Sequence, residues 1–357
     1  MSLYAVIIAG GRGKRFWPKS RMDRPKYLLS FFGSKTTLIQ QAVSRLQGIV
    51  DNKNILIITN KLQAKEVRKQ LPRIPQSNII PEPESKNTAA AIGLASVIIN
   101  TRDPSAVFIV LPADQLILDN DKFRAAIKTA AEYACLGNAV VTIGIKPTFA
   151  STGFGYIKTG KNIENNIFRA DAFVEKPDAK RAKQFLKSGN YFWNGGIFIS
   201  KASVMMEEIN KCAPKLSLGL KFIKMYAGTN KFDKAIARHY KGFDDISIDY
   251  AVMEKSKRVC VVKTNFKLYD IGSWKNIAEI MKHKARNNIV MGSHESVGTK
   301  SCIIVSNDEH LVGTVGLRDI IIIHTDDATL VCRKDKSELV KNLVEKIEKN
   351  KPLRKFL

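Results

Sequence analysis

Continuous apolar runs alternate with amphipathic stretches along the first 150 residues of the chain. The apolar runs predict strands at residues 4–9, 55–59, 107–111 and 140–145. Apolar residues at helical spacing between them predict helices at about 37–47, 61–70, 88–100 and 121–135. Strands that are apolar throughout are typical of a parallel sheet covered by helices on both faces. The pattern therefore predicts an α/β fold.

The pattern of hydrophobic and polar residues changes after residue 150, where glycines separate shorter apolar runs. We expect strands here at 168–174 and 197–200. Helical spacing returns at about 178–188, 201–211, 214–227 and 247–255. This part of the chain is predicted to extend the same sheet in a mixed fashion and to carry substrate loops.

A second change falls near residues 284–293, and we place a catalytic domain at 1–285 and a small domain at 293–357. Short strands are expected in the small domain at 301–305, 311–315, 319–324 and 328–332, followed by a charged helix at about 335–350. Short, evenly spaced strands predict a small β-roll or a stub of β-helix.

The hydrophobic content, net charge and cysteine pattern limit the classes of protein to which this chain can belong. With 357 residues and 45% hydrophobic content, the chain can bury a large core, and no apolar run is long enough to span a membrane. The net charge of +25 favours anionic ligands, but the basic residues are spread out, so no dedicated nucleic-acid module is expected. Five scattered cysteines without a C-x-x-C pair, and no secretory signal at the start, favour reduced thiols in the cytoplasm.

The first apolar run leads into a glycine loop loaded with cations, A-G-G-R-G-K-R-F-W-P-K-S-R at residues 9–21. Between Arg12 and Lys26 there are seven Lys or Arg residues and one acid. The loop fits neither the dinucleotide fingerprint, because Phe16 stands at the third glycine position, nor the P-loop, because Arg15 follows Gly-Lys. Backbone N–H groups and guanidinium groups in such a loop suit a polyphosphate, although a tight turn with solvated charges is the simpler alternative.

Two aspartates follow apolar segments far apart in the chain. Asp114 ends the run L-P-A-D, and Asp270 begins D-I-G-S-W. Carboxylates at the carboxyl ends of strands are well placed to hold Mg²⁺ against phosphates. Each aspartate could instead cap a helix or sit in a turn, and the sequence alone does not show that the two converge.

Three further segments offer polar groups for a sugar phosphate or a nucleotide. Glu175 and Lys176, in F-V-E-K-P, could take sugar hydroxyls and a phosphate, or form a surface ion pair. Asn194 follows the aromatic run 191–193, which suits a sugar ring but equally suits core packing. Asn87 and Thr88 could face a nucleotide or cap the helix that follows.

Taken together, these segments resemble the mannose-1-phosphate guanylyltransferases of the sugar-nucleotidyltransferase superfamily. The W-P-K-S-R extension of the glycine loop is specific to the mannose branch. The other matching motifs occur in the family's order: E-P-E-S-K-N-T-A at 82–89, L-P-A-D at 111–114, T-G-F-G-Y-I at 152–157, F-V-E-K-P at 173–177, W-N-G-G-I-F at 193–198, S-I-D-Y-A-V-M-E at 247–254 and D-I-G-S-W at 270–274.

The resemblance implies a Rossmann-like core of the nucleotide-diphospho-sugar transferase type and a small C-terminal β-helix-like domain that supports a homodimer. It also implies GTP and mannose 1-phosphate as substrates and Mg²⁺ on Asp114 and Asp270. Arg15 would hold the departing pyrophosphate, and Lys26 would neutralise the α-phosphate. The residues implied at the nucleotide are Gly10, Gly11, Gly13, Arg15, Lys26, Asn87, Thr88 and Asp114. Those implied at the sugar phosphate are Gly155, Glu175, Lys176, Asn194 and Asp270.

The chain departs from the family pattern at three positions near the phosphates. Lys14 replaces a small polar residue, Tyr27 replaces Gln, and Gln115 replaces the common His. Two rival hypotheses therefore stay open at this point. One is a nucleotidyltransferase for another hexose 1-phosphate or another nucleoside triphosphate, and the other is a non-catalytic regulatory or nucleic-acid-binding protein on the same fold.

Overall fold

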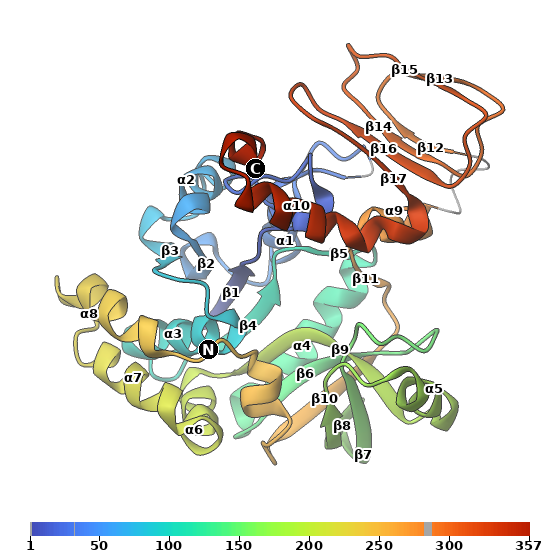
Figure 1. Ribbon diagram of the computed structural model, residues 1–357. Helices are drawn as coiled ribbons and strands as arrows, with labels where there is room; N and C mark the ends of the chain where they lie inside the picture. The colour runs from blue at the N-terminus through green and yellow to red at the C-terminus, as the bar shows by residue number, and fades with distance from the viewer. Residues whose placement is uncertain (1, 32, 282–287) are drawn as a thin grey trace.

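One nine-stranded sheet forms the centre of the protein, whose computed structural model describes residues 2–31, 33–281 and 288–357. The strand order is β3-β2-β1-β4-β9-β6-β10-β8-β7 (Figure 1). The strands are β1 Leu3–Ala9, β2 Ile55–Asn60, β3 Ile79–Glu82, β4 Val107–Pro112, β6 Val140–Ile145, β7 Tyr156–Glu164, β8 Ile167–Val174, β9 Tyr191–Lys201 and β10 Val259–Thr264.

The sheet is parallel on one side and mixed on the other. Strands β3, β2, β1 and β4 are parallel neighbours, whereas β9 runs antiparallel to both β4 and β6. An additional pairing of β7 with β9 joins β9, β6, β10, β8 and β7 into a ring. The predicted mixed α/β fold is therefore confirmed.

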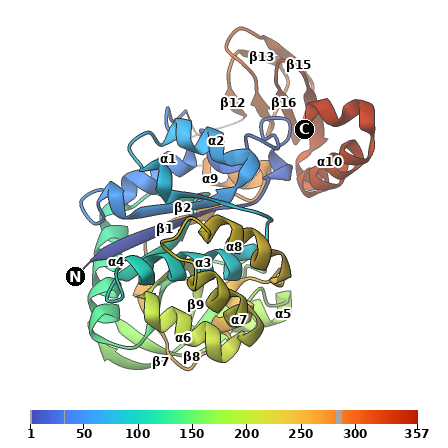
Figure 2. The ribbon, with the colours of Figure 1, turned by 90° about the vertical axis from the view of Figure 1, so that its left-hand side faces the viewer.

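Helices cover both faces of the sheet (Figures 1 and 2). They are α1 Leu38–Arg45, α2 Lys61–Gln70, α3 Asn87–Arg102, α4 Asn120–Leu136, α5 Ala179–Ser188, α6 Ala202–Cys212, α7 Pro214–Lys224, α8 Phe232–His239 and α9 Trp274–Met281. Alternate residues of β1 pack on opposite faces of the sheet. Val6 packs in the core shared with α3, α6 and α7, and Ile7 packs in the core shared with α1 and α4. This explains why the central strands are apolar at every position. Among the described residues, no helix has the length and apolar character needed to cross a bilayer.

The C-terminal residues form a small stack of strands that ends in a helix. The strands are β12 Ile289–Met291, β13 His294–Val297, β14 Ile303–Val305, β15 Val312–Val315, β16 Ile320–His324 and β17 Thr329–Arg333, and the helix is α10 Val340–Lys349. β12, β14 and β16 pair in parallel, as do β13 and β15, which is the arrangement of a short β-helix. α10 follows this stack and lies over the part of the molecule that contains the nine-stranded sheet, near the first 3-10 turn, Lys14–Phe16 (Figure 1).

Several predicted elements are wrong in extent or type. The expected helix at 247–255 is a single π-helical turn, Asp249–Met253, and the expected helix at 335–350 begins as a 3-10 helix, Lys334–Leu339, before α10. The strand expected at 197–200 starts six residues earlier, at Tyr191, because the aromatic run continues the ladder with β7. The predicted end of the first domain, residue 285, and residues 284–287 of the predicted boundary lie outside the described residues.

Candidate active site

The glycine loop follows β1 at the carboxyl edge of the sheet and bends sharply. Gly11 and Gly13 have φ values of +85° and +59°, which side chains other than glycine rarely adopt. A Cβ on Gly13 would lie 2.7 Å from Lys26 Cβ, so the loop touches the backbone that carries Lys26. The Ser20 hydroxyl donates to the Gly13 carbonyl at 2.7 Å and fixes this approach.

Lys26 is the centre of the site. Its side chain is buried, and Nζ donates to the Ile271 carbonyl at 2.8 Å. The same ammonium lies 2.6 Å from Asp114 Oδ2 and 3.6 Å from Asp270 Oδ1. The two aspartates that the sequence could not bring together therefore converge on one lysine.

A short two-stranded ladder causes this convergence. β5, Gln115–Ile117, pairs antiparallel with β11, Leu268–Asp270, and the register places Asp270 opposite Gln115. Asp114 directly precedes Gln115, so both carboxylates are held at one end of the ladder. Asp270 lies inside the cleft, and this desolvation raises the pKa of its carboxyl although 55% of the side chain is accessible. The positive charge of Lys26 opposes the rise, and the nearby charge of Asp114 adds to it.

A cavity of about 410 Å³ opens beside this cluster. Its lining consists of Gly10, Gly11, Arg12, Gly13, Lys14, Arg15, Phe16, Lys26, Tyr27, Asp114, Asp270, Gly272 and Lys341. The cations of the loop and the two carboxylates thus face one space, which suits a metal-bound polyphosphate. Asn87 and Thr88 are not among the lining residues. Thr88 Oγ1 instead accepts a hydrogen bond from Ile248 N at 2.9 Å.

The three departures from the family pattern have structural partners. Tyr27 is buried, and its hydroxyl donates to Gln63 Oε1 at 2.5 Å and lies 3.0 Å from Thr59 Oγ1. Burial raises the pKa of this phenol, so it stays neutral beneath the loop. Lys14 lies 2.9 Å from Glu348 on α10.

Gln115 connects the phosphate side of the site with the sugar side. Its Nε2 donates to the Gly195 carbonyl at 2.9 Å, and Gly195 follows Asn194 on β9. The Asn194 backbone N–H in turn donates to the Gly155 carbonyl at 2.8 Å. Hydrogen bonds therefore link Gln115, the neighbour of Asp114, to the segment that carries Asn194 and from there to Gly155.

Glu175 and Lys176 lie together on the sugar side, with Lys176 Nζ 2.9 Å from Glu175 Oε1. A Cβ on Gly155 would lie 2.3 Å from Glu175 Oε2, so a larger residue there would displace the Glu175 carboxylate. Burial alone would lower the pKa of the Lys176 ammonium, but its hydrogen bond to Glu175 and the charge of that carboxylate raise it. The aromatic run before Asn194 serves packing, because Trp193 is buried and stacks on Phe154 with ring centroids 4.8 Å apart.

Asp249 is a site residue to which the sequence reasoning gave no role beyond the first turn of a helix. Its Oδ1 accepts a hydrogen bond from Asn194 Nδ2 at 2.8 Å. Burial, together with the nearby charge of Glu175, raises the pKa of its carboxyl to about 6. A carboxylate flanked by the apolar residues of I-S-I-D-Y-A-V-M was the available signal.

Comparisons with known proteins match nearly the whole chain. Residues 4–287 match the family described as Nucleotidyl transferase, and residues 292–347 match the MannoseP isomerase/GMP-like beta-helix domain. The chain is 35% identical to the mannose-1-phosphate guanylyltransferase of Escherichia coli K12, over 97% of this chain and 73% of that protein. It is 34% identical to the mannose-1-phosphate guanylyltransferase RfbM of Salmonella typhimurium, over 98% of this chain and 73% of that protein.

A solved structure gives the same result for the fold. A Thermus thermophilus protein, described as a mannose-1-phosphate geranyltransferase, matches with a TM-score of 0.88 and 32% identity. The match covers 98% of this chain and 100% of that one, so it includes both the central sheet and the C-terminal strands.

Proposed function

Because the chain belongs to the nucleotidyl transferase family and, within it, to the mannose-1-phosphate guanylyltransferases, we propose that it transfers GMP from GTP to mannose 1-phosphate. The products are GDP-mannose and pyrophosphate. The observation that carries the proposal is the cluster at the base of the cavity, where Lys26 Nζ lies 2.6 Å from Asp114 and 3.6 Å from Asp270. A buried ammonium between two carboxylates, behind a cationic glycine loop, suits attack on a phosphate bound to a metal.

The two carboxylates fit Mg²⁺. Mg²⁺ prefers oxygen ligands and is commonly held by one or two carboxylates together with phosphates and water. Asp114 and Asp270 supply such oxygens beside the cavity. The described part of the chain contains no group of three or more His, Cys, Asp or Glu residues that could hold a metal ion, so phosphate oxygens and water would complete the shell around the two carboxylates. Bound there, Mg²⁺ would offset the charge that develops on the phosphate oxygens.

The chain's own residues would act by positioning and charge neutralisation. Lys26, held by the Ile271 carbonyl, would present its ammonium to the α-phosphate of GTP. Arg15, at the cavity wall, would hold the β- and γ-phosphates that leave as pyrophosphate. A phosphate oxygen of mannose 1-phosphate is itself the nucleophile, so no nucleophilic side chain is required.

The sugar phosphate would bind on the other side of the Gln115 bridge. Lys176 would bind its phosphate. The carboxylate oxygens of Glu175 would accept hydrogen bonds from the sugar hydroxyls, and the amide of Asn194 would donate one to a hydroxyl oxygen. Glu175 is well suited to this role because one of its oxygens, Oε2, is buried without a protein hydrogen bond. A homodimer and a cytoplasmic location remain predictions from the sequence.

Removal of either metal-site carboxylate tests the proposal. Asp114→Asn and Asp270→Asn should each abolish Mg²⁺-dependent formation of GDP-mannose, measured by chromatography, while thermal unfolding shows an intact fold. The matched control is Asp121→Asn, which removes a fully exposed carboxylate on α4 and should retain activity. Near-normal turnover in either site variant would contradict the assignment of that carboxylate.

A further inference from the structure

The glycine loop has little regular structure of its own. Between the end of β1 at Ala9 and the start of α1 at Leu38 the described residues contain only two 3-10 turns, Lys14–Phe16 and Lys26–Leu28. Three cations, Arg12, Lys14 and Arg15, lie within four consecutive residues of this loop. Their mutual repulsion would spread the loop unless neighbouring groups held it.

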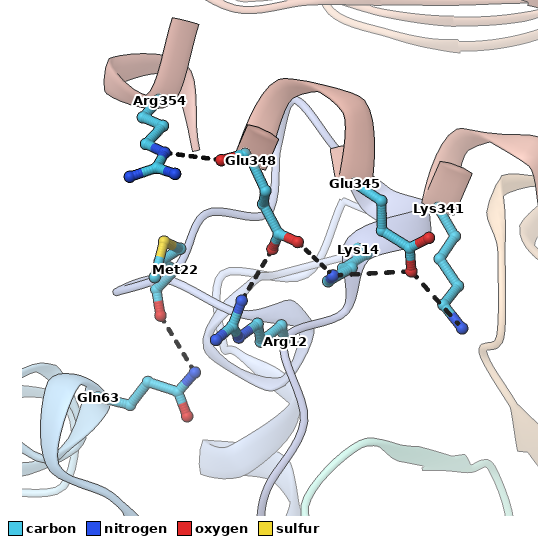
Figure 3. A network of polar contacts seen from close by, with 8 residues as sticks. All are labelled: Arg12, Lys14, Met22, Gln63, Lys341, Glu345, Glu348 and Arg354. Atoms are coloured by element: carbon cyan, nitrogen blue, oxygen red, sulfur yellow. Dashed lines mark hydrogen bonds and ion pairs between the residues drawn. The ribbon is translucent and has the colours of Figure 1, made fainter. Parts of the chain in front are cut away.

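One carboxylate of the C-terminal helix binds two of these cations. Glu348 Oε1 accepts a hydrogen bond from Arg12 Nη1 at 2.8 Å, and its Oε2 accepts one from Lys14 Nζ at 2.9 Å (Figure 3). Glu345, one turn earlier, lies 3.8 Å from the same Lys14 Nζ. The hydrogen bond from Lys14 and the charges of both cations hold the pKa of Glu348 below its usual range, so the carboxylate is ionised at neutral pH.

The helix is docked by more than this carboxylate. Val340, Val344 and Ile347 form a buried stripe on α10, and Trp17 Nε1 of the loop donates to the Phe356 carbonyl at 2.8 Å. On the other side of the loop, Gln63 Nε2 of α2 donates to the Met22 carbonyl at 3.2 Å (Figure 3). Loss of the Glu348 charge should therefore leave α10 in place and release Arg12, while Lys14 keeps only its longer ion pair with Glu345.

We propose that Glu348 is a positioning residue for the nucleotide site: it holds Arg12 and Lys14 so that the loop keeps the shape in which it binds a polyphosphate. The proposal rests on the proposed function for its substrate. In this proposal Lys14 contacts α10 rather than the phosphates. The C-terminal domain, through Glu348, keeps the phosphate-binding loop in shape. Lys341 of the same helix lines the cavity, which agrees with this role.

The test compares Glu348→Gln with the wild-type chain. Loss of two exposed or half-exposed ion pairs should raise the KM for GTP and the Kd for inorganic pyrophosphate roughly 2- to 30-fold, which corresponds to about 0.4–2 kcal/mol. kcat should change less than twofold, because Lys26 and the aspartates are untouched. Lys14→Met should also raise the KM for GTP and the Kd for pyrophosphate, but by less than Glu348→Gln does. In the double variant the rise in Kd should be smaller than the product of the two single fold-changes, because the two substitutions remove one shared ion pair. Glu348→Asp should partly restore affinity.

Hydrogen exchange provides a readout independent of turnover. Amides of residues 10–16 should exchange faster in Glu348→Gln, while those of α10 keep their protection. The control is Glu309→Gln, which removes an exposed carboxylate from a turn of the same domain and should change neither affinity nor exchange. Unchanged loop exchange, or tighter pyrophosphate binding in Glu348→Gln, would overturn the proposal, the latter because it would mean that Glu348 competes with phosphate. A lack of GDP-mannose formation in the wild type would refute the proposed function, and the exchange result would still decide the role of Glu348.

Discussion

Replacing Asp249 with asparagine should stabilise the protein at neutral pH and leave it little changed in acid. The carboxyl has a pKa of about 6 in the folded chain, compared with 3.8 ordinarily, because burial and the charge of Glu175 disfavour its ionised form. The unfolded chain therefore loses this proton at lower pH than the folded chain does. As the pH rises from about 4 to 6, the folded state is progressively penalised, and the penalty is full above pH 6.

The magnitude follows from the two pKa values. A difference of about two units, at 1.36 kcal/mol each, corresponds to about 3 kcal/mol. The introduced amide would mimic the protonated carboxyl, and its oxygen could still accept the hydrogen bond from Asn194. Its advantage should grow from about 0.5 kcal/mol at pH 4 to about 3 kcal/mol above pH 7, where it would raise Tm by roughly 4 °C.

Thermal unfolding of wild type and Asp249→Asn between pH 4 and pH 8 measures this difference. Asp245→Asn, which changes an exposed carboxylate four residues earlier, is the control and should give a curve parallel to that of the wild type. The reasoning is refuted if Asp249→Asn has the same Tm as the wild type at pH 8, or if its gain is equal at pH 4 and pH 8.

Two further substitutions test the geometry around the lysine. Gly13→Ala should destabilise the fold by about 1–3 kcal/mol and lower kcat, because the residue has a φ of +59° and a Cβ would meet Lys26 at 2.7 Å. Thermal unfolding measures the loss of stability, and initial rates measure the loss of kcat. Normal values for both would show that the loop can shift to accept the methyl group. Lys26→Ala should lower kcat about 100-fold or more while the Kd for GTP changes far less, because the lysine charge acts mainly on the transition state. Steady-state rates measure kcat, and calorimetry measures the Kd. An equal loss of kcat and of GTP affinity would mean that Lys26 acts in ground-state binding.

The central strands could be predicted from the sequence because burial on both faces requires apolar residues at every position, as in β1 and β4. Other strands lack that signal. β3 is only four residues long and contains Pro81, and the last four residues of β7, 161–164, are exposed. β9 was predicted only in part, since its first residues resemble an aromatic loop and its pairing with β7 depends on tertiary structure.

The candidate site divides in the same way. Its phosphate loop could be predicted locally, because glycines and cations are concentrated in one short segment. The meeting of Asp114 with Asp270 depends on the β5–β11 register, over a separation of more than 150 residues, and no local pattern encodes it. Glu348 went unrecognised for the same reason: its importance comes from where α10 docks, and as a residue of a charged helix it resembles any solvated glutamate.

The most direct test of the whole account is a pyrophosphate-release assay of the wild-type protein with Mg²⁺. Four nucleoside triphosphates are each paired with mannose, glucose and fucose 1-phosphates, and the nucleotide sugar is identified by mass spectrometry. The account predicts the highest kcat/KM for GTP with mannose 1-phosphate, with GDP-mannose as the product and one pyrophosphate released for each. Release of pyrophosphate only with another base or another sugar would contradict the substrate assignment, and no release with any pair would contradict the proposed reaction.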